Sequence, residues 1–167
     1  MSLAGTRLLA AATRPLRAAR RPRVDAVEVV PGLWLGSAPS RAQAAALAEI
    51  GVDAVVDLRA EIDDRAGRLW RDGVRVHRAR LEDHGAPSPE ELRAAATLVA
   101  SLMGEGRTVL VHCRAGMERG PTVACAALML QGWSLDEAYR RISDLRKRTL
   151  PTDGQLAALI ALLPTRA

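Results

Sequence analysis

Short apolar runs, some of them alternating with polar positions, are separated along the chain by longer segments that begin at capping residues. Short runs bounded by turn residues are typical of strands. We expect strands over residues 26–30, 33–35, 53–58, 74–79 and 108–111. We expect helices over residues 41–50, 89–103, 121–130, 135–146 and 152–163. Strands that alternate with helices predict an α/β domain, in which helices flank a central, twisted and mainly parallel sheet.

Capping residues mark where several of these helices begin. Ser40 is a typical N-cap for the helix over residues 41–50, which should end at Gly51. Ser88 is followed three residues later by Glu91, the spacing of a capping box. Pro121 fits the first position of the next helix, where its missing N–H group needs no partner.

Positive charge is concentrated near the amino terminus. The net charge is +5 at pH 7, but residues 1–24 hold six arginines and no acidic residue. Without these arginines, 18 basic residues stand against 19 acidic ones. We therefore expect a flexible basic tail over residues 1–25 and one folded domain over residues 26–165. A nucleic-acid-binding domain should carry its basic surface on the fold itself, so we expect no nucleic-acid partner.

The tail has two interpretations. Its arginines and alanines resemble an organellar transit peptide or a segment in weak contact with an anionic membrane surface. The alternative is a disordered extension. Two cysteines, Cys113 and Cys125, make no disulfide framework and indicate a reducing compartment. We expect a cytoplasmic protein, or an organellar one if the tail is a transit peptide. The sequence contains no apolar run of about 18 residues, so we expect no membrane-spanning helix.

The most strongly β-like run, residues 108–111, leads into the polar loop His-Cys-Arg-Ala-Gly-Met-Glu-Arg at residues 112–119. Cys113 thus follows a buried strand and precedes a helix, where successive backbone N–H groups form an anion-binding concavity that favours a thiolate. Arg119 closes the loop with a planar fork that can bind two phosphoryl oxygens. Gly116 allows a turn where a Cβ would crowd. The loop therefore predicts a phosphate site with a nucleophile in it.

The spacing His112-Cys113-x5-Arg119 resembles the signature of the protein tyrosine phosphatase superfamily, and in particular its dual-specificity phosphatases. Further likeness lies in residues 32–37, 55–59, 134–142 and 146–155. Together the resemblance covers residues 27–163. It implies a phosphomonoester hydrolase that forms a cysteinyl-phosphate, acts on phosphotyrosine, phosphoserine or phosphothreonine, and needs no metal or other cofactor.

The resemblance also implies a role for each site residue. Cys113 would attack phosphorus, and Arg119 would stabilise the transition state. Asp83, about thirty residues before the cysteine, would be the general acid, with Glu82 and His84 as weaker competitors. Backbone amides would hold the phosphoryl oxygens in a phosphate-binding loop that consists of Arg114, Ala115, Gly116, Met117, Glu118 and Gly120 around Arg119. His112 would orient this loop.

Two residues depart from the family pattern. Gly120 stands where the family carries serine or threonine, whose hydroxyl helps the thiolate leave the phosphoenzyme. We therefore expect slow hydrolysis of the intermediate. Glu118 places a carboxylate beside the arginine, and Arg114 is the only extra cation of the loop. This charge balance disfavours inositol lipids with several phosphates.

Other classes and substrates remain open on the sequence alone. A rhodanese-type sulfurtransferase also uses a cysteine loop, but its loop is usually one residue shorter. Low-molecular-weight phosphatases and arsenate reductases carry the motif near their amino terminus. A catalytically weak phosphate-binding module is a further alternative, because of Gly120. The substrate could also be a phosphoglycan, a nucleotide or a lipid phosphate. Cys125 is expected to be a core residue and Asp57 a strand-end contact.

Overall fold

The computed structural model describes residues 22–62 and 69–163. The expected flexible tail lies outside the described residues up to residue 21, so that prediction stands without a structural outcome. Within the described residues, no helix is long and apolar enough to cross a membrane.

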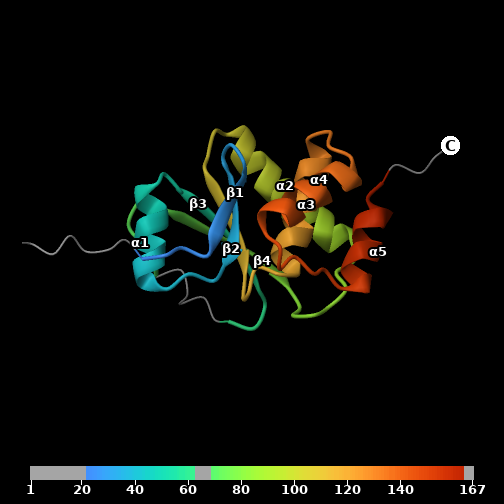
Figure 1. The fold of residues 1–167 in the computed structure, drawn as a ribbon, viewed down its shortest axis with the longest axis horizontal. Coiled ribbons are helices and arrows are strands. Elements are labelled where there is room, and N and C mark those ends of the chain that lie inside the picture. Colours follow the sequence, from blue (N-terminus) through green and yellow to red (C-terminus); the bar gives the residue numbers. More distant parts are fainter. Residues whose placement is uncertain (1–21, 63–68, 164–167) are drawn as a thin grey trace, which may run out of the picture.

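Within these described ranges, five strands form one sheet in the order β1-β2-β5-β3-β4 (Figure 1). Their bounds are β1 Ala26–Val30, β2 Leu33–Ser37, β3 Ala54–Arg59, β4 Arg75–Leu81 and β5 Val109–Cys113. β1 and β2 form an antiparallel hairpin, and the pairs β2–β5, β5–β3 and β3–β4 are parallel. The expected α/β domain with a mainly parallel sheet is confirmed.

Helices cover both faces of this sheet. Their bounds are α1 Arg41–Glu49, α2 Pro89–Gly104, α3 Arg119–Leu130, α4 Leu135–Leu145 and α5 Asp153–Ala161. α1 lies on one side of the sheet, and α2, α3, α4 and α5 lie on the opposite side (Figure 1). The buried residues form two hydrophobic clusters, and alternate residues of β5 belong to different ones. Leu110 packs in the smaller cluster, on the side of α1, whereas Val109 and Val111 pack in the larger cluster.

The expected caps are present at two helices. Ser40 and Ser88 each accept a hydrogen bond from the backbone three residues on, and Gln43 and Glu91 complete the capping boxes. Pro121 is not the first residue of its helix, as we expected, but the third. α3 begins two residues earlier, at Arg119, which is possible because N–H groups in the first turn have no intrahelical partner in any case.

The cysteine loop lies at one edge of the sheet. β5 is central and every one of its residues is buried. It ends at Cys113, and α3 starts at Arg119, so the loop lies at the carboxyl edge of the parallel strands. In α/β sheets, ligands bind at this edge.

Candidate active site

The loop between β5 and α3 wraps around the sulfur of Cys113. The amide of Gly116 donates a hydrogen bond to Cys113 Sγ at 3.2 Å, and the cysteine is 3% exposed. Gly116 has a φ of 63°, and a Cβ there would meet the carbonyl oxygen of Gly36 at 2.5 Å. The loop therefore depends on glycine at this position, as the sequence indicates.

A pocket of about 330 Å³ opens over this loop. It is lined by Asp83, His84, Cys113, Arg114, Ala115, Met117, Glu118 and Arg119. The structure thus brings together the expected nucleophile, the expected arginine and the expected acid. Glu82, which the sequence left as a competitor for the acid role, lines a different pocket.

Arg119 is buried at the back of the site with 1% of its surface exposed. Its guanidinium binds both oxygens of Glu61, at 2.7 and 3.0 Å, and donates to the carbonyl oxygen of Leu81 at 3.1 Å. Its Nε is buried and has no hydrogen-bond acceptor among the described residues. Burial favours loss of the proton, but the hydrogen bonds with Glu61 and the negative charges of Glu61, Cys113 and Asp83 together outweigh it and raise the pKa of Arg119 above its ordinary value.

Glu61 was not expected at the site from the sequence. Its carboxylate is held by Arg119, whose hydrogen bonds lower the pKa of Glu61. The residue follows β3 by two positions, at the same carboxyl edge of the sheet as Cys113. An acidic residue just beyond a buried parallel strand is the only sequence signal that points to it.

Asp83 reaches the pocket from the loop after β4. Its Oδ1 lies 2.6 Å from Arg119 Nη2, and its side chain is 33% exposed. This contact places a carboxyl group at the guanidinium and within the cysteine pocket. A proton donor there would face the leaving group of a bound phosphate ester.

His112 lies behind the loop and is buried. Its Nδ1 is 3.3 Å from the carbonyl oxygen of Cys113, and its Nε2 is 3.9 Å from Asp57 Oδ2. Burial lowers the pKa of His112, and Asp57 only partly offsets this effect. Asp57 itself is held by Arg59, which lies at the end of β3, so it makes the expected strand-end contact.

Arg146 binds the backbone of the cysteine loop. The sequence did not lead us to expect this residue at the site. It donates to the carbonyl oxygens of Gly116 and Ala115 at 2.6 and 3.0 Å. The same guanidinium binds both oxygens of Asp25, at 2.9 and 3.1 Å. Because carbonyls that are tied outward leave the loop amides free to point inward, Arg146 supports an anion-binding conformation.

Gln155 contacts both the loop that carries Asp83 and α3, the helix that follows the cysteine loop. It is fully buried in the first turn of α5. Its Nε2 donates to the carbonyl oxygen of Gly85 at 3.3 Å, and its Oε1 lies 3.3 Å from the hydroxyl of Thr122 in α3. Gln155 therefore contacts both segments that carry the expected catalytic groups.

The second cysteine is part of the core, as expected. Cys125 lies on α3 with 1% of its surface exposed, and burial raises the pKa of its thiol to about 12. It therefore stays protonated at neutral pH and packs as a small apolar residue.

Comparison with known proteins identifies the family to which this constellation belongs. A family model described as "Dual specificity phosphatase, catalytic domain" matches residues 33–163. Dual specificity protein phosphatase 12 of Mus musculus is 34% identical over 130 residues, which cover 77% of this chain and 38% of that protein. Dual specificity protein phosphatase 5 of Rattus norvegicus is 30% identical over 150 residues, which cover 87% of this chain and 38% of that protein. The chain thus corresponds to well under half the length of these relatives.

Solved structures agree with the sequence matches. Tk-PTP in its active form superposes with a TM-score of 0.75 at 29% identity, over 83% of this chain and 95% of that chain. Human DUSP28 superposes with a TM-score of 0.70 at 25% identity, over 84% of this chain and 93% of that chain. The chain belongs to the dual-specificity phosphatase family of the protein tyrosine phosphatase superfamily.

Proposed function

We propose that this chain hydrolyses phosphate monoesters through a cysteinyl-phosphate on Cys113. The observation that carries the proposal is the common pocket of Cys113, Arg119 and Asp83, in which Asp83 and Arg119 are 2.6 Å apart. A nucleophile, a cation and a proton donor that face one cavity are the parts that phosphoryl transfer needs.

Substrate binding would use the loop amides and the buried arginine. The loop amides would receive phosphoryl oxygens, and Arg119 Nε, which has no acceptor among the described residues, would donate to one of them. Because the guanidinium is held by Glu61 and Leu81, it would meet the phosphoryl group in a fixed orientation. No metal ion is needed for this step, since the cation and the amides offset the phosphoryl charge.

The first chemical step would transfer the phosphoryl group to sulfur. The sulfur of Cys113 forms a bond to phosphorus while the bond from phosphorus to the leaving oxygen breaks. Asp83 donates its proton to that oxygen, so the alcohol leaves neutral and Asp83 becomes a carboxylate.

The second step would return the enzyme to its starting state. Asp83 takes a proton from water, the water oxygen bonds to phosphorus, and the phosphorus–sulfur bond breaks to give inorganic phosphate and the Cys113 thiolate. Gly120 offers no hydroxyl to the leaving sulfur, so we expect this step to limit the rate.

Phosphorylated protein is the substrate class we favour, because the curated relatives are named dual specificity protein phosphatases. A lipid or glycan phosphate is the second candidate. PTPMT1, a fold neighbour with a TM-score of 0.70, was solved in complex with PI(5)P, and for this reason we include a lipid phosphate among the candidate substrates. Glu118 lines the pocket, and its negative charge argues against ligands with several phosphates.

A substrate panel tests this proposal. The full chain is assayed with p-nitrophenyl phosphate, phosphopeptides, a phosphoglycan and a monophosphorylated inositol lipid. Cys113→Ser should abolish turnover and Asp83→Asn should strongly reduce it, whereas Cys125→Ser should keep it. Phospho-ligand binding without any turnover by the wild-type chain would instead identify a pseudophosphatase.

A further inference from the structure

His84 and Glu118 join two segments of the site at the mouth of the pocket. His84 directly follows Asp83 in the loop between β4 and α2, residues 82–88, which we call the acid loop. Glu118 directly precedes α3. His84 Nδ1 lies 2.8 Å from Glu118 Oε2, and both residues line the same pocket as Cys113. The proposed hydrolysis gives neither side chain a role in its chemical steps.

The contact between His84 and Glu118 depends on charge more than on hydrogen-bond geometry. Glu118 Oε2 is buried and has no donor in hydrogen-bonding geometry within the described ranges, although the ring nitrogen is close. A buried acceptor is costly to leave unsatisfied, and an imidazolium beside it offsets that cost by coulombic attraction. The pair is therefore most favourable when His84 carries a positive charge.

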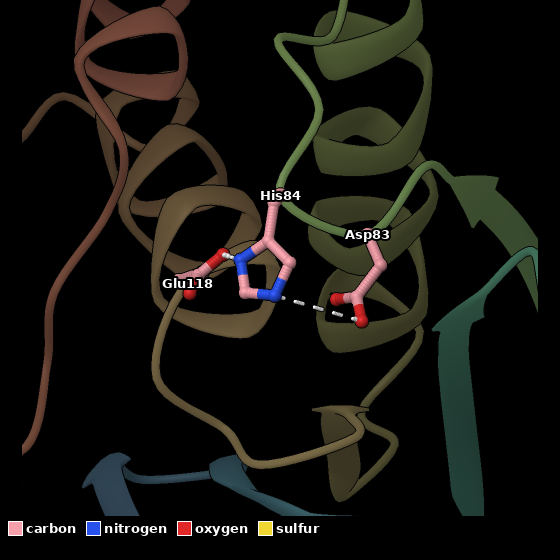
Figure 2. Close-up of side chains that lie close together, drawn as sticks. All are labelled: Asp83, His84 and Glu118. Atoms are coloured by element: carbon pink, nitrogen blue, oxygen red, sulfur yellow. Dashed lines mark ion pairs between the residues drawn. The ribbon is translucent and has the colours of Figure 1, made fainter.

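The side chain of Glu118 is directed at His84 and not at its own helix. Glu118 is the N-cap residue of α3, but its side chain makes no capping hydrogen bond. A carboxylate in this position is ordinarily stabilised by the free N–H groups of the first turn. Figure 2 shows the carboxylate next to the His84 ring instead. The backbone carbonyl of Glu118 accepts a hydrogen bond from the hydroxyl of Thr122 at 2.8 Å, so the residue is fixed at the start of the helix.

The backbone of His84 also needs contacts that hold it. Its φ is 54°, the one positive value of a non-glycine residue in the described part of the chain. A residue with a side chain adopts this left-handed conformation only where the surrounding structure holds it. The next residue, Gly85, is bound through its carbonyl oxygen by Gln155 Nε2. Glu118 and Gln155 thus hold consecutive residues of the acid loop, immediately after Asp83.

The ring of His84 acts on Asp83 through the backbone that the two residues share. Figure 2 shows the imidazole between the carboxyl groups of Asp83 and Glu118. His84 Nε2 is 4.0 Å from Asp83 Oδ2, which is too far for a hydrogen bond. His84 therefore holds the loop in place without binding the carboxyl group that has to exchange a proton.

We propose that the ion pair of His84 with Glu118 positions the general acid Asp83 over the cysteine loop. Without the pair, the acid loop would sample other positions, and Asp83 would reach the leaving oxygen less often. The side chains of His84 and Glu118 are thus positioning residues, which act through Asp83 and not on phosphorus. The inference rests on the proposed function, because it concerns the acid of that reaction.

The leaving-group dependence of kcat/KM tests this role on the full chain. One substrate is phenyl phosphate, whose leaving group needs a proton, and the other is an aryl phosphate whose phenol is strongly acidic. kcat/KM reports the steps up to transfer of the phosphoryl group to sulfur, so slow release of phosphate does not mask the effect. The ratio of the two values cancels the influence of the Glu118 charge on phosphate binding, which both substrates share.

His84→Asn should lower kcat/KM for phenyl phosphate at least about fivefold and change the other value much less. Asparagine tolerates the left-handed backbone at position 84 and carries no charge. Glu118→Gln should change the ratio in the same way, and the double variant should change it no more than either single variant. His84→Arg keeps a cation and should restore most of the ratio that His84→Asn loses. Glu82→Gln, on an exposed neighbour in the acid loop, is the matched control and should leave the ratio unchanged.

Three results with an active wild-type enzyme would overturn the positioning role alone. They are an unchanged ratio in His84→Asn or Glu118→Gln, additive losses in the double variant, and equal losses in His84→Asn and His84→Arg. A wild-type chain that hydrolyses neither substrate would refute the proposed function and with it the positioning role. Urea denaturation of the same variants would still test the ion pair, because paired side chains lower the free energy of unfolding by less in the double variant than in the sum of the single ones.

Discussion

Glu61 binds the guanidinium of Arg119 through both of its carboxylate oxygens, at 2.7 and 3.0 Å. The pair joins the segment after β3 to the first residue of α3. It fixes the orientation of a buried cation, and it also holds a negative charge against the guanidinium that would contact a phosphoryl group. Glu61 and phosphate therefore compete for Arg119.

Glu61→Gln should make inorganic phosphate a better inhibitor. Loss of one carboxylate charge near a screened anion is worth about 1 kcal/mol, or about fivefold in the inhibition constant. The same change should lower the free energy of unfolding by about 1 kcal/mol, because a charge-assisted contact of Arg119 is weakened. Phosphate inhibition of p-nitrophenyl phosphate hydrolysis and urea denaturation check both effects. Glu105→Gln, on an exposed residue after α2, is the control, and unchanged or weaker phosphate inhibition in Glu61→Gln would refute the competition.

Gln155→Leu should impair the general acid more than the nucleophile. The amide of Gln155 holds the carbonyl oxygen of Gly85, two residues after Asp83. When this contact is lost, Asp83 should be less well placed to protonate the leaving group. Turnover should fall at least about fivefold with phenyl phosphate, whose leaving group needs a proton, and much less with an aryl phosphate whose phenol is strongly acidic. Gln131→Leu, at the exposed end of α3, is the control; an equal loss with both substrates would mean a structural role only.

Gly120→Ser should speed the release of phosphate from the enzyme. A Cβ at position 120 would lie 3.7 Å from Cys113 Sγ, so a serine hydroxyl there could reach the leaving sulfur. The same Cβ would meet the end of the Leu35 side chain at 2.9 Å, which has to shift slightly. Gly120→Ala requires the same shift of the Leu35 side chain but adds no hydroxyl, so it is the matched control. Rapid-quench kinetics should show a burst of leaving group in wild type and in Gly120→Ala, and a smaller or absent burst in Gly120→Ser. A linear time course in wild type would contradict slow release.

The stability of the fold should decrease in mild acid because of His112. Burial lowers the pKa of this imidazole below its ordinary value of 6.5. Below about pH 6.5 the imidazole of the unfolded chain therefore binds a proton, whereas that of the folded chain stays neutral until the pH reaches its lower pKa. The free energy of unfolding therefore decreases as the pH falls through this window. His112→Asn should flatten the dependence of unfolding free energy on pH there, whatever its effect on the absolute value. Parallel curves for wild type and His112→Asn, from urea denaturation at several pH values, would show that another group is responsible.

Local signals explain why the fold and the core of the site could be predicted. Ser40 and Ser88 begin their helices because each cap bonds to a backbone group three residues away. Cys113 and Arg119 belong to one loop, whose position between a buried strand and a helix determines its geometry. The position of Pro121 in its helix was predicted wrongly, because α3 begins at Arg119, the last residue of the predicted loop, and not at the proline that propensity alone favours.

The remaining site residues could not be predicted because they meet only in three dimensions. Arg146 contacts Gly116 from thirty positions along the chain, and Gln155 contacts Gly85 from seventy. Nothing in the local sequence distinguishes Arg146 from its neighbour Arg148, although the first is buried and the second is exposed. Only the order of strands in the sheet and the packing of α4 and α5 bring these side chains to the loop.

Trapping of a phosphoenzyme tests the central claim most directly. Wild-type protein is mixed with p-nitrophenyl phosphate, quenched in acid during the burst, digested and examined by mass spectrometry. The account predicts one phosphoryl group on the peptide that contains Cys113, none on Cys125, and neither phosphoenzyme nor turnover in Cys113→Ser. Full turnover by Cys113→Ser, or phosphate found on another residue of an active wild-type enzyme, would contradict it.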